Sequence, residues 1–395
     1  MAVGEEQHIV ESRRAAPGRP LHVAHLLCGK EEGGITTAIR TLVRHLPEDI
    51  RCSLIVLRPM PSARNIVPDE RLHHIRRSFT GDPRTVRLIS HLCRKMQIDV
   101  LHSHSIGSNL YGRLVRRQRP DLSLVTTVHA STRAEARGAM QSHWKGRLLA
   151  WTDFAMRGLT DHFIAVSESL RDELVERGIR EDQVTAISHG LDVADLAATP
   201  DEIARARRTF DLPEGRPVVG IVGRLTWVKN HDMFLRAARR VVDAAPETLF
   251  LVVGDGPMAE DLLQKTESLG LRDHVRFTGW LDSVAPLLQL LDILAITSHS
   301  EGFGYAVLEG MATACVPVST RVSEMPRIID HQRTGLLVPA DDDAAMADAI
   351  LELVRSPEKR AGMAEAARRE ALERFSVNQE IADTRACYLE VIRRR

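Results

Sequence analysis

The sequence predicts an α/β protein of two domains, each built around a doubly wound parallel sheet. Three observations support this prediction. The chain has 395 residues, which is too long for one compact core and suggests about two domains. Short apolar stretches alternate with helical segments, as strands and helices do in parallel sheets. The alternation breaks off in a charged stretch rich in Ala and Pro (196–217) and then starts again.

The first half begins with an apolar strand predicted at 21–27, LHVAHLL, which runs into a Gly-Gly turn. Helices fit residues 36–45 and 83–96. Further apolar stretches predict the other strands of this sheet, at 51–57, 99–104, 123–129, 161–167 and 183–190. Because strands and helices alternate, we expect the sheet to be parallel.

The second half repeats the pattern. A strand at 218–224 leads into a helix at 231–245, and a strand at 248–257 ends in a glycine turn before another helix. Short strands follow at 274–279, 292–297, 314–319 and 335–339. From about Ser356 the chain is nearly all helical. The predicted parts are a flexible N-terminal tail (1–19), an N-terminal domain (20–197), a linker (198–216), a C-terminal domain (217–375) and a last helix (376–395).

Cysteine usage and hydropathy predict a cytoplasmic protein. The five cysteines are scattered, odd in number and without a C-x-x-C pair, which favours a reducing compartment over a disulfide framework. No stretch approaches 18 apolar residues, so we expect no membrane span. Residues 1–19 lack an apolar core and resemble a loose tail more than a signal peptide.

The net charge of zero conceals a basic region. Residues 51–150 hold 18 Lys and Arg against 6 Asp and Glu, with clusters at 71–77 and 113–119. One interpretation is a solvated face. The other is a surface for an anionic acceptor or for anionic lipid, which would place the protein peripherally at the cytoplasmic membrane face. Nucleic acid is a poor partner for this region, because almost no aromatic residues interleave the charges.

Several cofactor and metal motifs are absent from the sequence. Neither half has G-x-G-x-x-G after its first strand, which argues against a nicotinamide or flavin site. There is no Walker loop, no H-E-x-x-H and no cysteine-based zinc spacing, so we expect no metal and no cofactor. The lone GDG turn, with Gly254, is interpreted first as a simple strand exit.

The segment EGFGYAVLE (301–309) carries the strongest functional signal. It lies between a predicted buried strand and a predicted helix start, which is where open α/β sheets bind ligands. Gly302 and Gly304 let the backbone approach a ligand closely and direct its N–H groups toward it. We therefore expect a ligand at this turn.

The carboxylates and amides of this segment suit a ligand that is rich in oxygen. Glu309 can accept two hydrogen bonds from a vicinal diol such as a ribose, and Glu301 can bind a sugar hydroxyl. The backbone amides from Phe303 to Tyr305 can meet phosphate or sugar oxygens. The alternative is that Glu309 only stabilises the N-terminus of its own helix.

A second constellation follows the first strand of the second half, in GRLTWVKN (223–230). Arg224 and Lys229 place two positive charges at a strand end, ahead of a helix N-terminus. This combination suits a diphosphate and could stabilise its charge as it departs. The alternative is an ordinary surface loop.

Weaker signals come from the first half. The Gly33–Gly34 turn after the first strand permits the close approach of a ligand, although Gly-Gly is common in loops. His104 and His129 end two adjacent predicted strands, and a histidine there could bond a sugar hydroxyl or polarise a leaving group. His189, in ISHGLD, has less support. A lone histidine is more often structural.

Together, these segments resemble a known family. The order GGI, DVLHSH, TTVHAS, FIAVSESL, ISHGLDV, GRLTWVKN, GDGP and EGFGYAVLE is similar to that of retaining glycosyltransferase family 4, including its E-x7-E motif. The resemblance runs from about Leu21 to Phe375. It implies the GT-B fold, in which two Rossmann-like domains face each other across a central cleft and the last helix crosses back onto the first domain.

The resemblance also implies roles for these residues. Arg224 and Lys229 would bind the diphosphate of a nucleotide-sugar, Glu309 its ribose and Glu301 its sugar, with His129 close to the sugar. These residues, apart from Glu309, would be catalytic. The other donor-binding residues would be Gly34, Gly223, Gly254, Trp280, Phe303, Gly304 and Tyr305. The acceptor side of the cleft would include Gly33, His104 and His189, although the family usually has asparagine where His189 stands.

The resemblance implies a metal-independent retaining transferase that moves a sugar, with a UDP-sugar favoured, to an acceptor hydroxyl in glycan, glycolipid or natural-product biosynthesis. The leaving phosphate would take the acceptor proton on the same face. Two alternatives stay open. A GT-B nucleotide-sugar epimerase would convert the donor without an acceptor, and a non-catalytic sugar-binding protein would bind a free sugar but no nucleotide diphosphate.

Overall fold

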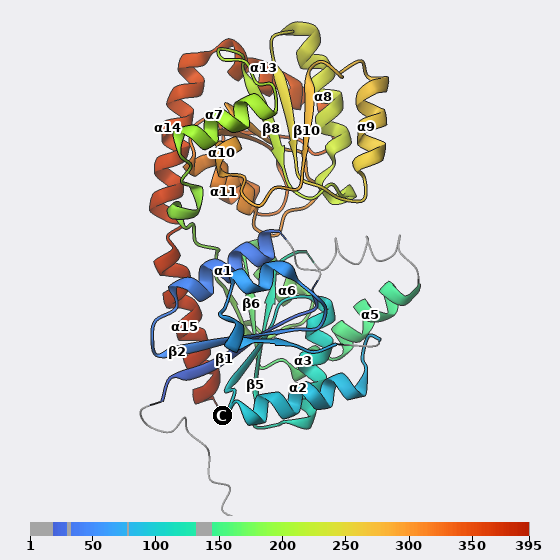
Figure 1. Cartoon of the computed structure of the whole chain (residues 1–395), viewed down its shortest axis with the longest axis vertical. Helices are drawn as coiled ribbons and strands as arrows, with labels where there is room; N and C mark the ends of the chain where they lie inside the picture. Colours follow the sequence, from blue (N-terminus) through green and yellow to red (C-terminus); the bar gives the residue numbers. More distant parts are fainter. Residues whose placement is uncertain (1–18, 30–32, 77–78, 132–143, 395) are drawn as a thin grey trace, which may run out of the picture.

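The computed structural model describes residues 19–29, 33–76, 79–131 and 144–394. Except for Arg19, the predicted N-terminal tail lies outside these residues. Figure 1 shows two α/β domains one above the other, with the last two long helices running down one side of both. The predicted fold class of two doubly wound parallel-sheet domains is confirmed.

The N-terminal domain contains a seven-stranded sheet of order β3-β2-β1-β4-β5-β6-β7, and every pairing in it is parallel. Its strands are β1 (Leu21–Leu27), β2 (Ile50–Val56), β3 (Leu72–His74), β4 (Val100–Ser103), β5 (Ser123–Val128), β6 (His162–Ala165) and β7 (Val184–Ala186). The described helices of this domain are α1 (Gly34–His45), α2 (Pro83–Lys95), α3 (Ile106–Gln118), α5 (Trp144–Ala155) and α6 (Glu168–Glu176).

Strand β3 was not predicted. The sequence analysis assigned only a basic cluster to residues 71–77, yet Leu72–His74 pair with β2. Three residues at the edge of a sheet are too few for a period of two to be visible, and charged residues are common on edge strands.

The C-terminal domain contains a six-stranded parallel sheet of order β10-β9-β8-β11-β12-β13. Its strands are β8 (Val218–Val222), β9 (Leu249–Val253), β10 (Val275–Gly279), β11 (Ile293–Ile296), β12 (Val316–Thr320) and β13 (Leu336–Val338). The helices are α7 (Pro200–Thr209), α8 (His231–Ala244), α9 (Ala259–Ser268), α10 (Ala285–Leu288), α11 (Tyr305–Ala312), α12 (Met325–Ile328), α13 (Asp343–Arg355), α14 (Pro357–Arg374) and α15 (Val377–Arg393). Helix α7 occupies the stretch assigned to the linker and packs against α10.

The strand order fixes where each sheet can bind a ligand. The order reverses between β8 and β11 in the second sheet and between β1 and β4 in the first. Open α/β sheets bind ligands outside the carboxyl ends of their strands at such a reversal. The loop 223–230 follows β8 and the segment 301–304 follows β11, so both predicted motifs of the C-terminal domain lie at its reversal point.

The last helix returns to the first domain. Helix α15 buries Cys387, Tyr388 and Val391 against the apolar face of the N-terminal sheet, and Figure 1 shows it beside β1 and β2. The crossing is tight, because a Cβ added to Gly190 would lie 2.4 Å from the Cα of Val377. Among the described residues, no helix is both long and apolar enough to cross a membrane.

The close approach at Gly190 predicts the effect of a small substitution. Gly190→Ala should lower the free energy of unfolding by about 1–3 kcal/mol, because the added methyl group must displace the backbone at the start of α15. Urea denaturation measures the change. Gly158→Ala is the matched control, since a Cβ there meets no atom within 4 Å. Equal stability of the two variants would show that the crossing is not tightly packed.

Candidate functional site

The carboxyl edges of the two sheets meet at the turn that follows β11. A Cβ added to Gly302 would lie 1.8 Å from the carbonyl oxygen of His129, at the end of β5. One apolar cluster also spans both domains and includes Phe163 and Leu170 on one side and Phe303 and Val307 on the other. The strand-end loops of the two domains therefore face each other, and we call this region the interdomain site.

Lys229 and Glu301 come together at the centre of this site. The Lys229 ammonium donates to both carboxylate oxygens of Glu301, at 2.7 and 2.9 Å. The Ser298 hydroxyl also donates to Oε1, at 2.5 Å, and the Glu301 amide donates to the Ser323 hydroxyl at 3.2 Å. Glu301 is only 8% exposed, so these partners compensate the cost of burying its charge. Ser298 and Ser323 were not predicted, because neither belongs to a recognisable motif.

Arg224 lies in the same loop as Lys229 but does not join the Lys229–Glu301 pair. It is exposed, and within the described chain no residue pairs with its guanidinium. The loop is held by glycines, since a Cβ added to Gly254 (φ 131°) would lie 2.1 Å from the Gly223 carbonyl oxygen. This contact gives Gly254 a packing role between the loops after β8 and β9.

The start of α11 is fixed by aromatic contacts. Gly304 caps the helix in the left-handed region at φ 88°. The buried Phe303 ring meets the His189 ring edge-on at 5.5 Å, and the Tyr305 hydroxyl donates to the Gly190 carbonyl at 3.3 Å. Both aromatic side chains thus hold the two domains together. What the helix start offers to a ligand is the amides of Tyr305 and Ala306, which precede the first hydrogen bond of the turn, from the Val307 amide to the Gly304 carbonyl.

Glu309 lies in the second turn of α11, opposite α1 of the other domain. Burial raises the pKa of Glu309 to about 7, while the Arg40 guanidinium acts to lower it and Asp195 acts to raise it. Arg40 in turn donates to Asp195 at 3.0 Å. Arg40 and Asp195 were not predicted, because neither belongs to a local motif and only the tertiary fold brings them to Glu309.

The predicted histidines of the first domain form part of one group. His104 Nδ1 is 3.1 Å from His129 Nε2, and the His129 ring stacks on His189 at 5.5 Å. His189 is held by the last helix, because its Nδ1 lies 3.0 Å from a Glu380 carboxylate oxygen. Glu380 also accepts from the Gly190 amide at 2.8 Å, so one carboxylate of α15 holds two consecutive residues after β7.

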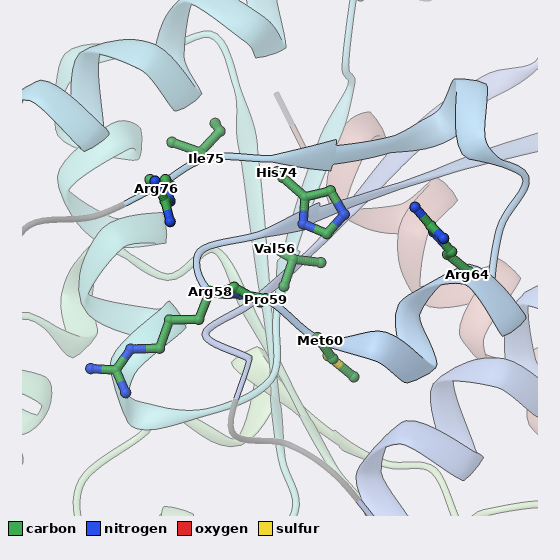
Figure 2. Close-up of a pocket in the computed structure, with 8 residues that line it drawn as sticks. All are labelled: Val56, Arg58, Pro59, Met60, Arg64, His74, Ile75 and Arg76. Atoms are coloured by element: carbon green, nitrogen blue, oxygen red, sulfur yellow. The ribbon is translucent and has the colours of Figure 1, made fainter.

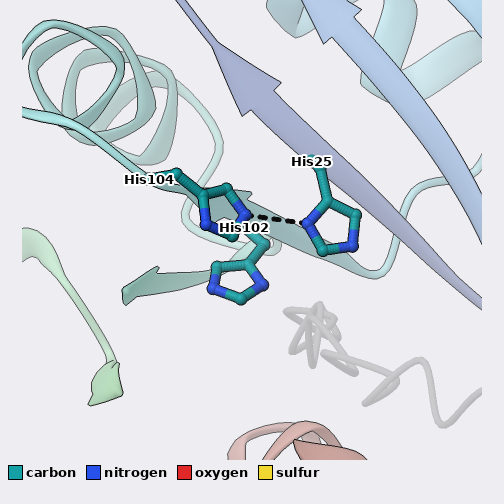
Figure 3. A group of neighbouring side chains, drawn as sticks. All are labelled: His25, His102 and His104. Carbon is teal, nitrogen blue, oxygen red and sulfur yellow. Dashed lines mark hydrogen bonds between the residues drawn. The ribbon is translucent and has the colours of Figure 1, made fainter. Parts of the chain in front are cut away.

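Two further histidines, His25 in β1 and His102 in β4, extend the group and were not predicted as site residues. Figure 3 shows the rings of His25, His102 and His104 beside one another. One nitrogen of each lies within 4.8 Å of the others, which is a geometry that could hold a metal ion. The nitrogens already have hydrogen-bond partners: His25 Nδ1 is 2.8 Å from His104 Nε2, and His102 bonds Tyr388 and Thr127. The group is therefore satisfied as a network of imidazoles.

The remaining predicted residues lie at the edges of the interdomain site. Gly33 (φ 100°) and Gly34 begin α1, and a Cβ on either would meet no atom within 4 Å. Trp280 follows β10 and is 57% exposed. A third feature was not predicted: the exposed Trp227 ring stacks on His299 at 4.5 Å.

A basic pocket of about 570 Å³ opens at the carboxyl ends of β2 and β3. Figure 2 shows Arg58 and Arg76 on one side of it and Arg64 on the other, with His74 between them. Among the residues that the structure describes, no carboxylate belongs to its lining, although Arg64 lies 3.6 Å from the exposed Asp69 outside it. The pocket therefore suits an anionic group.

Comparison with known proteins identifies both halves. Residues 202–370 match the family model "Glycosyl transferases group 1", and residues 32–195 match the model "Glycosyltransferase Family 4". The chain is 30% identical to a D-inositol 3-phosphate glycosyltransferase of Saccharomonospora viridis, over 70% of this chain and 67% of that protein. It is 28% identical to the N-acetyl-alpha-D-glucosaminyl L-malate synthase of Bacillus anthracis, over 59% of this chain and 66% of that protein. The chain thus spans just under two thirds of the length of this second relative.

Solved structures share the fold. HepE of Anabaena in complex with UDP and glucose superposes with a TM-score of 0.81 at 18% identity, covering 94% of this chain and all of that one. Sucrose-phosphate synthase from Thermosynechococcus elongatus gives a TM-score of 0.77 at 18% identity, covering 95% of this chain and 100% of that one.

The raised pKa of Glu309 predicts a pH-dependent stability. Between the ordinary pKa of 4.5 and about 7, the folded protein holds a proton that the unfolded chain releases, so stability falls as the pH rises through this window. Glu309→Gln should therefore gain stability over the wild type at pH 8 and much less at pH 5. Urea denaturation at both pH values measures this, with Glu365→Gln, an exposed site on α14, as the control. An equal change at both pH values would contradict the assignment.

Proposed function

Because this chain belongs to glycosyltransferase family 4, we propose that it transfers a sugar from a nucleoside-diphosphate sugar to a hydroxyl group, with retention of configuration. The observation that carries the proposal is the placement of two motifs at one reversal point. The loop after β8 brings Lys229, and the segment after β11 brings Glu301, into direct contact. A cation and a carboxylate at the carboxyl edge suit a diphosphate and a sugar side by side.

The donor would lie across the start of α11. Glu309 would accept from the ribose hydroxyls, and the first-turn amides of α11 would bind phosphate or sugar oxygens. Arg224 is free to turn toward the diphosphate, since its guanidinium has no partner in the described part of the chain. UDP is the favoured nucleotide, a choice supported by the UDP complexes among the structures with this fold.

The reaction follows from this placement. The bond between the sugar C1 and the diphosphate oxygen breaks, and the bond between C1 and the acceptor oxygen forms on the same face. The acceptor proton passes to the leaving phosphate oxygen. Arg224 and Lys229 would stabilise the charge that develops on the diphosphate, so the proposal needs no metal. As Lys229 turns to the phosphate, Glu301 gains free lone pairs for a sugar hydroxyl.

The acceptor is proposed to carry a phosphate or carboxylate. The arginine-lined pocket lies on the N-terminal domain, at the same sheet edge as His129. Relatives named for inositol 3-phosphate and malate use anionic compounds, which supports this class. From β2 to β5 there are three strand spacings, roughly 14 Å, so the anionic group would lie well away from the reacting hydroxyl.

Donor binding is the first test. A thermal-shift screen of UDP-, GDP-, ADP- and dTDP-sugars should identify one stabilising nucleotide. Arg224→Ala and Lys229→Ala should each lower the rate roughly 10²–10³-fold, through the loss of a charge-assisted contact of about 2–4 kcal/mol. Glu309→Ala should raise the donor KM. Arg272→Ala, a highly exposed site in the same domain, is the control.

Three results would count against this assignment. Activity of Arg224→Ala near the wild-type rate would remove the diphosphate role, and unchanged nucleoside binding by Glu309→Ala would remove the ribose role. Inversion at the anomeric carbon, seen by NMR of the product, would refute retention. Conversion of the donor without any acceptor would instead identify an epimerase.

The acceptor class has its own test. With the identified donor, we expect transfer to phosphorylated or carboxylated hydroxyl compounds and little transfer to their neutral parents, scored by mass spectrometry. Arg58→Ala and Arg76→Ala should each raise the acceptor KM about 10–100-fold and leave the donor KM unchanged, because each removes a charge-assisted hydrogen bond of about 1.5–3 kcal/mol. Arg117→Ala, exposed on α3, is the control. Equal use of neutral compounds would exclude this role for the pocket.

A further inference from the structure

We propose that a one-way chain of hydrogen bonds, from the Cys52 thiol through His25 and His104 to His129, fixes His129 as a neutral N–H donor toward the bound substrate. The identity of that substrate rests on the proposed function, but the chain itself does not. In this proposal Cys52, His25 and His104 are positioning residues, and only His129 touches the substrate.

The chain is continuous in the structure. Cys52 Sγ lies 3.7 Å from His25 Nε2, and the other nitrogen of His25, Nδ1, lies 2.8 Å from His104 Nε2. His104 Nδ1 then lies 3.1 Å from His129 Nε2. His25 and His104 thus each use one ring nitrogen for the preceding member of the chain and the other ring nitrogen for the next member. Figure 3 shows the central link between His25 and His104.

The chain runs from the interior to the interdomain site. Cys52, His25 and His104 are at most 4% exposed, whereas His129 is partly exposed. Within the described residues, nothing hydrogen-bonds the last nitrogen, His129 Nδ1. The hydrogen-bond chain therefore ends on a protein group, Cys52, in the interior, and on a ring nitrogen, His129 Nδ1, that is left for a substrate at the interdomain site.

The three imidazoles are neutral near physiological pH. Burial lowers the pKa of His25 to about 4 and the pKa values of His104 and His129 well below their ordinary value. A neutral imidazole has one N–H donor and one acceptor nitrogen. The position of one hydrogen in the chain therefore determines the positions of all the others. Only two arrangements exist: every donor points outward, toward His129, or every donor points inward, toward Cys52.

The thiol selects the outward arrangement. Burial raises the pKa of Cys52 to about 12, so the sulfur keeps its hydrogen. Sulfur is a weak acceptor, whereas the lone pair of an imidazole nitrogen is a good one, so S–H donates to His25 Nε2. His25 and His104 then donate from Nδ1, and His129 is left with its hydrogen on Nδ1, the nitrogen without a partner among the described residues.

The direction decides what His129 can do. A neutral imidazole with its free nitrogen protonated can donate a hydrogen bond to a sugar or phosphate oxygen, but it cannot accept the acceptor's proton at that nitrogen. The proton therefore has to go elsewhere, in agreement with its proposed transfer to the leaving phosphate.

A metal ion on His25, His102 and His104 is the competing interpretation of the same rings. A metal bound by the facing nitrogens of His25 and His104 would displace the hydrogen that the two share, so the chain and the metal exclude each other. Elemental analysis of the purified protein distinguishes the metal site from the hydrogen-bond chain. One equivalent of a bound transition metal would contradict the proposed hydrogen-bond chain.

The decisive measurement is ¹⁵N NMR of protein labelled at histidine, which distinguishes protonated from unprotonated ring nitrogens. In the wild type at neutral pH, we expect His129 to be protonated at Nδ1 alone. Cys52→Ser, whose hydroxyl can donate or accept, should lose part of this preference. Cys52→Ala, which lacks the donor, should give a mixture of both arrangements. Protonation of His129 at Nε2 in the wild type would overturn the proposal. This test needs no activity, so it stands even if the proposed reaction is wrong.

Kinetics give a second test. His104→Phe should lower kcat about tenfold, the equivalent of one neutral hydrogen bond, with little change in nucleotide affinity. His162→Phe is the matched control, because His162 is also buried in the same sheet and bonds Thr185 outside the chain. Equal losses in the His104 and His162 variants would mean that His104 only supports the fold.

Discussion

The backbone of Gly302 lies so close to the carbonyl oxygen of His129 that any side chain at position 302 would push the two domains apart. This contact sets the separation of the two carboxyl edges, and the rest of the site depends on it. On one side it positions the segment that carries Glu301, together with Lys229. On the other it positions the end of β5, where His129 stands. Helix α15 reinforces the arrangement from behind, because Glu380 holds both His189 and the Gly190 amide.

The two glutamates of one motif are in different electrostatic states. Glu301 is neutralised by Lys229, a direct ion pair at 2.7 Å, and is further hydrogen-bonded by Ser298. Within the described part of the chain Glu309 has no such partner, and burial raises its pKa to about 7. Glu301 thus enters any binding event with its charge already compensated, whereas the charge of Glu309 becomes easier to carry once hydroxyl donors reach it. The two glutamates of the segment 301–309 can therefore play different roles, although their side chains are identical.

Much of the fold was predictable from the sequence, because apolar strands and helices alternate so regularly, and the loops 223–230 and 301–304 could be placed at strand ends. Their pairing at one reversal point follows from the strand order. What could not be predicted depends on contacts between distant segments. Arg40 faces Glu309 only because α1 lies opposite α11. His25 and His102 look like ordinary residues of apolar strands, and β3 is too short for a visible period. Local pattern locates the loops, and the packing of distant elements decides what surrounds them.

The division of charge between the domains also has a chemical consequence. The C-terminal side supplies cations, Arg224 and Lys229, which in the proposed reaction stabilise a departing diphosphate. A charged imidazole at His129, next to the transferred sugar, would repel the positive charge that develops on that sugar. Burial keeps His104 and His129 neutral and removes this conflict. A neutral imidazole still has to present the correct nitrogen, and nothing on the substrate side can ensure that before binding. A hydrogen-bond chain that begins at a buried thiol can ensure this before the substrate binds. The imidazole network inside the sheet therefore prepares the site at the edge of the sheet.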